Sequence, residues 1–165
     1  MISIQNNTDE NFTSIRAIAK EVWPIAYGAI LSEAQLDYMM EMMYSIPSLQ
    51  KQASEKRNHF IMATENDIPV GFAAYEFNYN GMPKTKIHKI YILSNQQRKG
   101  IGRILTDYII KEATQNKQEA LLLNVNKNNI AQHFYKKLGF TISHEEVIDI
   151  GNGYVMDDYV MEISI

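Results

Sequence analysis

Residues 97–103 have the types and spacing of an anion-binding turn. Gly100 and Gly102 follow an apolar stretch typical of a strand and precede an amphipathic stretch typical of a helix. Glycine lets the backbone turn tightly and come close to a ligand, and the free N–H groups at the start of a helix attract negative charge. Three basic side chains add positive charge there: Arg98, Lys99 and Arg103. The segment therefore predicts a site for a phosphorylated ligand.

Two other phosphate-binding motifs fail at single residues. A dinucleotide-binding fingerprint needs a third glycine where this chain has Leu105. A nucleotide P-loop needs Gly-Lys followed by Ser or Thr, whereas Gly102 is followed by Arg103 and Ile104. The alternative without a ligand is a glycine-bearing turn with solvated basic residues, because motif matches carry a false-positive risk.

Strands and helices are expected before this segment. Short apolar runs predict an opening strand and then an antiparallel meander with turns at Asn66-Asp67 and Asn80-Gly81. The expected strands are residues 1–5, 59–65, 70–78 and 86–93. Between the first two, helical spacing predicts a helix over residues 9–22. A capping box at Ser32 predicts a second helix, which would bury Leu36, Met39, Met40 and Met43.

After the segment, helix and strand patterns alternate. The helices are expected at residues 101–113 and 129–138, the latter closed by Gly139, and the strands at 121–125, 141–150 and 154–163. The last two strands would form a hairpin at Gly151-Asn152-Gly153. The strand–helix–strand step around the glycines should be parallel, within a mixed, mostly antiparallel sheet of about six to seven strands. The predicted fold class is a single α/β domain over residues 1–165, its central sheet flanked by helices.

Composition excludes several classes of function. A chain of 165 residues with 45% hydrophobic and 21% charged residues can bury its own core. It has no cysteine, and its four histidines lack ligand spacing, so we expect no metal. A net charge of −3 argues against a nucleic-acid partner. We expect a cytoplasmic protein with no membrane partner, because the start lacks a signal pattern and no apolar run approaches the roughly 18 residues of a span.

A second motif follows one helix and one strand after the first. It comprises Asn128, Ala131, Phe134-Tyr135 and Leu138-Gly139-Phe140. Together with Gln97-x-x-Gly100-x-Gly102 after an Ile-Tyr-Ile strand, it resembles the GNAT superfamily of acetyl-CoA-dependent N-acetyltransferases. This resemblance covers residues 86–140. More narrowly, residues 23–52 and 151–161 are similar to bacterial polyamine (spermidine or spermine) acetyltransferases.

The resemblance implies acetyl-CoA as cosubstrate. The glycine segment would cradle its pyrophosphate, the end of the preceding strand would hydrogen-bond its pantetheine arm, and Asn128 would contact it nearby. The implied cosubstrate-binding residues are Tyr91, Ile92, Leu93, Gln97, Arg98, Lys99, Gly100, Ile101, Gly102, Arg103 and Asn128. Tyr135 would be the catalytic acid that protonates the departing thiolate. The alternative is that Tyr135 is only an aromatic on the apolar face of its helix, with Phe134 and Leu138.

The general base is harder to assign. Many members of the superfamily carry a Glu on the strand before the glycines, but residues 85–93 of this chain contain no carboxylate. His88 stands there, and an ordinary His pKa of about 6.5 suits a base. It shares alternation with Ile90 and Ile92, an arrangement that a bulge would change. His88 is our catalytic candidate, with a structural role for it, Glu76 or a water chain as alternatives.

The resemblance implies that the acceptor is a primary amine, and we expect a small cationic amine such as a polyamine. Trp23 and Tyr27 are the candidate acceptor-binding residues, because they lie between two expected helices, where this superfamily builds its acceptor wall. Four acidic residues could attract a cation, although most such residues only face water: Glu33, Glu41, Asp157 and Asp158. The alternatives are a protein or peptide N-acetyltransferase and a non-catalytic acyl-CoA-binding regulatory domain. A homodimer is compatible with the resemblance, because such domains often pair.

Overall fold

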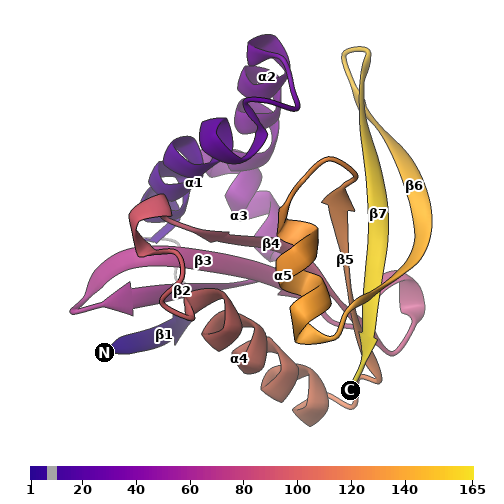
Figure 1. Ribbon diagram of the computed structural model, residues 1–165. Helices are drawn as coiled ribbons and strands as arrows, with labels where there is room; N and C mark the ends of the chain where they lie inside the picture. Colours follow the sequence, from indigo (N-terminus) through magenta and orange to yellow (C-terminus); the bar gives the residue numbers. More distant parts are fainter. Residues whose placement is uncertain (7–10) are drawn as a thin grey trace.

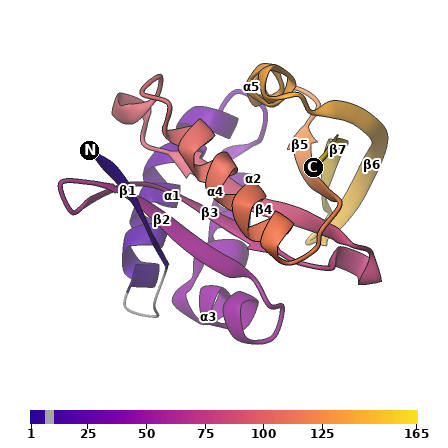
Figure 2. The ribbon, with the colours of Figure 1, turned by 90° about the horizontal axis from the view of Figure 1, so that it is seen from below.

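A seven-stranded sheet separates two layers of helices (Figures 1 and 2). The structure is a computed structural model that describes residues 1–6 and 11–165. Its helices and strands are β1 (Ile2–Asn6), α1 (Phe12–Tyr27), α2 (Glu33–Tyr44), α3 (Ile46–Ser54), β2 (His59–Glu65), β3 (Ile68–Glu76), β4 (Lys84–Ile92), α4 (Ile101–Gln115), β5 (Ala120–Asn126), α5 (Ala131–Leu138), β6 (Thr141–Gly151) and β7 (Tyr154–Ser164). The predicted α/β fold class is confirmed.

The sheet has the strand order β1-β2-β3-β4-β5-β7-β6. Its described strands pair antiparallel except for β4 and β5, which are parallel. The parallel step predicted around the glycines is therefore confirmed. The apolar run 121–125 lies in β5, between β4 and β7, and is buried on both faces as expected.

Strands β4 and β5 stay paired over only part of their length. Lys84–Ile87 of β4 faces Ala120–Leu123 of β5, and the pairing ends there. Beyond that point β4 continues to Ile92 and β5 to Asn126. Figure 1 shows the two strands running apart, with α5 near the opening. The sheet is therefore split where the two parallel strands reach their carboxyl ends.

Two apolar clusters fill the spaces on either side of the sheet. The first contains residues of α4 and α5 packed on the sheet, including Leu105, Leu121 and Phe140. The second contains residues of α1 to α3 on the opposite face, including Trp23 and Phe72. Complete burial of each large side chain contributes about 1.5–3 kcal/mol. These clusters hold the helices that border the split.

The first helix differs from its prediction. It was expected over residues 9–22; residues 7–10 lie outside the described part, and the helix continues to Tyr27. Trp23 and Tyr27, expected between two helices, thus form its last turn. Both are buried at i, i+4 spacing, with Trp23 2% and Tyr27 7% exposed, which offsets the cost of Pro24 inside the helix.

The third helix was not predicted as a separate element. Ser45 caps α3 by accepting a hydrogen bond from Ser48 N at 3.3 Å, and Pro47 lies in its first turn. A capping Ser followed by Pro is the sequence signal that could have found it. The predicted cap of α2 is confirmed, because Ser32 Oγ accepts from Gln35 N at 3.1 Å.

Candidate active site

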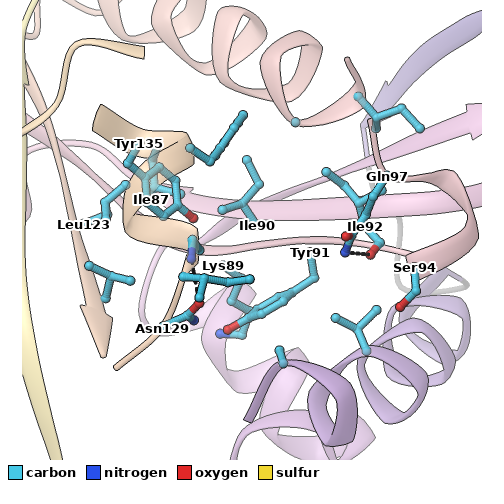
Figure 3. Close-up of a pocket in the computed structure, with 18 of the residues that line it drawn as sticks. Ile87, Lys89, Ile90, Tyr91, Ile92, Ser94, Gln97, Leu123, Asn129 and Tyr135 are labelled. Carbon is cyan, nitrogen blue, oxygen red and sulfur yellow. Dashed lines mark hydrogen bonds between the residues drawn. The ribbon is translucent and has the colours of Figure 1, made fainter. Parts of the chain in front are cut away.

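The split between β4 and β5 opens into a cavity of about 570 Å³. Its walls come from four parts of the chain: the end of α1, the second half of β4, the turn leading into α4, and the end of β5 with the start of α5. In Figure 3 the labelled residues of β4 lie beside Tyr135 from α5 and Asn129 from the loop before it. The cavity therefore joins both sequence motifs.

The glycine segment forms an open helix start at one side of this cavity. Arg98 and Gly100 have positive φ angles of 68° and 79°. Gly100 is the N-cap of α4, and no side chain of the described residues 1–6 and 11–165 caps that helix. The first N–H groups of α4 are thus available to an anion, and Ile101, Gly102 and Arg103 line the cavity there.

The two glycines are required for different reasons. Gly100 adopts the left-handed conformation, and a Cβ there would meet nothing within 4 Å. At Gly102, a Cβ would stand 2.9 Å from Phe134 Cζ and 3.2 Å from Ile92 Cδ1. The first glycine permits the turn, and the second permits close packing of α4 against α5 and β4.

The basic residues of the segment point to different partners. Arg98 and Arg103 line the cavity. Lys99 does not, because its ammonium group contacts Gln96 Oε1 at 2.8 Å and Glu65 Oε2 at 3.4 Å. Positive charge at the open helix start therefore comes from the two arginines.

The free part of β4 offers backbone groups to an extended ligand. Tyr91 and Ile92 line the cavity, whereas Leu93 packs against the cluster of α1 to α3. Among the strands that the structure describes, none pairs with this part of β4 on the β5 side, so its backbone groups there lack a ladder partner. Gln97 also lines the cavity, and its Nε2 donates to Ile92 O at 3.4 Å (Figure 3).

Tyr135 lies in the cavity wall and is 8% exposed. Its ring packs against Phe134 and Phe140, with centroids 5.3 and 5.9 Å away. Burial, with a smaller effect of the Tyr27 hydroxyl, raises the pKa of Tyr135 well above its ordinary value of 10. The phenol is therefore protonated at neutral pH and can donate a proton.

Asn128 lies next to the cavity rather than in its wall. Its backbone N donates to Asn126 Oδ1 at 2.9 Å, which forms the turn after β5. Asn129 lines the cavity instead. Its Oδ1 accepts from Ala131 N at 2.8 Å and so satisfies a donor at the start of α5. The structure thus brings the neighbour of the predicted residue into the site.

His88 occupies a β-bulge and lines the cavity. Ala74 pairs with Lys89 and Tyr75 with Ile87, which leaves His88 as the extra residue of β4. Its Nε2 lies 3.2 Å from Glu76 Oε1. Burial, followed by the charges of Lys86, Lys89 and Lys56, lowers the pKa of His88 to about 3. The imidazole is therefore neutral at pH 7, and Nε2–H donates to the carboxylate.

The two predicted acceptor residues have different positions. Tyr27 lines the cavity, and its hydroxyl lies 3.1 Å from that of Tyr91. Trp23 lies behind it, 2% exposed, with ring centroids 4.7 Å from Tyr27 and 5.8 Å from Tyr91. Trp23 therefore fixes the two tyrosines and does not reach the cavity itself.

One polar cavity residue, Asn124, was missed from the sequence. It lies within the apolar run of β5, near the carboxyl end of a strand that runs parallel to β4. Ligands of α/β sheets commonly bind outside the carboxyl ends of parallel strands, and this position is the signal that could have identified it.

Two features are absent from residues 1–6 and 11–165. No three His, Asp or Glu side chains gather there so as to hold a metal ion. None of the helices formed by those residues has the length and apolar character needed to cross a membrane.

Comparison with known proteins gives the family. Residues 30–162 match the model of the acetyltransferase (GNAT) domain. The chain belongs to the GNAT acetyltransferase family. Two curated relatives of this GNAT domain are the L-amino acid N-acyltransferase MnaT of Escherichia coli and the L-methionine sulfoximine/L-methionine sulfone acetyltransferase of Salmonella typhimurium. Each is 27% identical over 86 residues, which cover 50% of this chain and 50% of the relative. The chain spans about half the length of these relatives.

Solved structures show that the fold is also that of the family. The PaiA N-acetyltransferase of Thermoplasma acidophilum, in complex with coenzyme A, has a TM-score of 0.84 at 21% identity, over 100% of this chain and 99% of its own. The ribosomal-protein-S18-alanine N-acetyltransferase of Escherichia coli has a TM-score of 0.74 at 18% identity, over 100% and 94%. The predicted family and fold are confirmed.

Proposed function

We propose that residues 1–165 act as one N-acetyltransferase domain, which transfers acetyl from acetyl-CoA to a primary amine by direct attack in a ternary complex. The observation that carries this proposal is the cavity itself. It runs from the uncapped start of α4 to the buried phenol of Tyr135, along a stretch of β4 with no partner on the β5 side. An elongated thioester with a phosphorylated end matches these features.

The residues that would hold acetyl-CoA follow from this placement. The N–H groups at the start of α4, with Arg98 and Arg103, would bind the pyrophosphate. The backbone of Tyr91 and Ile92 would pair with the pantetheine arm. Lys99, Leu93 and Asn128 would contribute indirectly, because they do not line the cavity. The residues present therefore fit the cosubstrate.

Tyr135 would act as the acid. As the amine nitrogen forms a bond to the thioester carbon and the C–S bond breaks, the phenol donates its proton to the leaving sulfur. The nitrogen loses its proton to solvent, and the Tyr135 phenolate takes a proton back from solvent, which restores the phenol. A phenol kept protonated by burial is suited to this step.

His88 remains the candidate proton acceptor named from the sequence, because it lines the same cavity in its neutral form. A pKa of about 3 nevertheless makes it a weak base toward an ammonium group, whose ordinary pKa is about 10.4. Water therefore takes a large share of this role.

For the acceptor we propose a small cationic amine such as a polyamine, next to Tyr27 and with Trp23 in support. An amino acid is the second candidate, because the two curated relatives are named for acylation of amino acids.

Coenzyme A release with spermidine, spermine, L-methionine and an N-terminal peptide tests the proposal. We expect turnover of at least one amine. Tyr135→Phe should lower kcat by about 10²–10⁴-fold, the usual contribution of a positioned acid. Unchanged kcat in that variant would remove the acid role. Tight acetyl-CoA binding without any turnover would favour a regulatory domain.

A further inference from the structure

Two carboxylates meet beside the cavity on the outer strands. Glu146 of β6 and Asp158 of β7 are register partners. Asn124 of β5 contacts both, since its Nδ2 donates to Glu146 Oε2 at 2.8 Å and to Asp158 Oδ2 at 3.4 Å. Asn124 also lines the cavity, and its amide group keeps a carbonyl oxygen that can accept a further hydrogen bond.

Asp158 is an unusual member of this group because it is buried. It is 4% exposed, and its Oδ1 has no hydrogen-bond partner among the residues that the structure describes. A buried carboxylate oxygen without a partner is costly. Within the same residues, no ion pair reaches Asp158 or Glu146. The site therefore carries negative charge that a cation would stabilise.

The groups that face Asp158 come from several elements. Lys86 of β4 acts on it as a cation, but its Nζ donates to the Tyr79 hydroxyl at 3.1 Å. The carboxylate also acts on Tyr27 of α1, because burial and the charge of Asp158 both raise the pKa of Tyr27. Burial raises the pKa of Asp158 itself; the Asn124 amide opposes this, whereas Glu146 and Asp157 add to it. The negative charge thus lies near the tyrosine that borders the cavity.

We propose that Asn124, Asp158 and Glu146 form the subsite for the ammonium group of the acceptor, which Asn124 contacts through its carbonyl oxygen and the two carboxylates attract by charge. This inference rests on the proposed function and names its substrate class. The subsite favours amines that have no carboxylate close to the nitrogen, because like charges repel. Polyamines and amino-acid amides fit it, and free amino acids do not.

A matched pair of acceptors tests this directly. L-Methionine and L-methioninamide differ only in the charged carboxylate, and their kcat/KM values are compared in the wild type, Asp158→Asn and Glu146→Gln. Asp157→Asn and Glu145→Gln are the controls. They remove the same charge one residue away, where both side chains pair with Lys127 at 3.0 and 3.1 Å.

We expect the wild type to prefer the amide by about tenfold or more, and this ratio to fall by about tenfold in each subsite variant, as when a charged hydrogen-bond partner is lost. The controls should keep the wild-type ratio. Equal ratios in Asp158→Asn and Asp157→Asn would overturn the proposal. If Asp158→Asn melts at a much lower temperature, Glu146→Gln and Asn124→Ala carry the same comparison.

Spermidine binding separates this inference from the chemistry. Calorimetry with coenzyme A present should show binding to the wild type and the controls, and a loss of about tenfold in affinity for the subsite variants. Such a result without turnover would sustain the subsite and remove the proposed reaction. Turnover with equal kcat/KM for L-methionine and L-methioninamide would sustain the proposed reaction and remove the subsite.

Discussion

Three tyrosines, Tyr27, Tyr91 and Tyr135, line a cavity whose other walls combine aliphatic and polar side chains. Burial raises the pKa of each phenol above its ordinary value. All three are therefore hydrogen-bond donors at neutral pH. The hydroxyls of Tyr27 and Tyr91 share one hydrogen bond of 3.1 Å, in which one donates and the other accepts. Tyr135 is the phenol that we assign as proton donor to a ligand.

A conservative change at His88 should have a small effect. Because the pKa of His88 is about 3, it is a weak acceptor for a proton from an ammonium group. We expect His88→Gln to change kcat/KM by less than about threefold, against the roughly 10²–10⁴-fold contribution of a general base. A pH profile in saturating acetyl-CoA checks this. A large loss together with a shifted acidic limb would instead assign the base to His88.

At the scale of elements, the bulge of β4 decides which side chains face which layer. The extra residue at His88 places Ile87, Ile90 and Ile92 with the cluster of α4 and α5. Tyr91 then packs with the cluster of α1 to α3. Lys89 points the same way, since its Nζ hydrogen-bonds to Gln52 Oε1 of α3. The bulge thus supplies the site with Tyr91 and directs the buried ammonium group of Lys89 toward α3, although Lys89 also lines the cavity.

That lysine should make stability depend on pH. Burial, with the charge of Lys56, lowers the pKa of Lys89 from 10.5 to about 7. Between these values the unfolded chain holds more protons, so the free energy of unfolding should rise from pH 7 to about pH 10.5. Lys89→Met should flatten this rise in urea titrations, whereas exposed Lys51→Met should keep it. Equal slopes in both variants would contradict the assignment.

Packing of α4 against α5 gives a second prediction for these elements. Gly102→Ala places a methyl group against Phe134, and we expect the free energy of unfolding to fall by about 1–3 kcal/mol, as for other overpacked sites. Coenzyme A should also bind more weakly, because the start of α4 moves. Phe134→Leu should recover part of both losses in the double variant. Additive losses in urea titration and calorimetry would show that the two residues are not coupled.

Helices and strands were predictable from the sequence where the apolar residues keep one periodicity along the whole element. Strand β2 was predicted with its exact bounds, and most other strands within two residues, because alternation and turn residues agree there. The predicted end of α1 at residue 22 was wrong, because burial of Trp23 and Tyr27 outweighs the cost of Pro24 inside the helix. The side of the sheet that Lys89 faces could not be predicted, because the bulge that sets it leaves no local sequence signal. The hydrogen bond between Asn124 and Glu146 could not be predicted either, because it joins strands that are distant in the sequence.

For the whole molecule, the short pairing of β4 with β5 means that the proposed coenzyme A site lies at the junction between two parts of the sheet. Coenzyme A bound in the split would contact both strands and both motifs. Present at 100 times its Kd, it should stabilise the fold by about 2.7 kcal/mol and raise Tm by several degrees. Differential scanning fluorimetry measures this shift. Binding measured by calorimetry without any shift in Tm would contradict preferential binding of coenzyme A to the folded chain.

The same junction divides the sheet into unequal halves, β1 to β4 and β5 to β7, held by a parallel ladder between Lys84–Ile87 and Ala120–Leu123. A pantetheine arm bound in the opening would contact both parts of the sheet and so restrict their relative motion. Amide hydrogen exchange along β4 and β5 should then slow when coenzyme A is added, even where no residue touches it. The donor would thus stiffen the wall against which the acceptor must bind, which favours loading of the donor first.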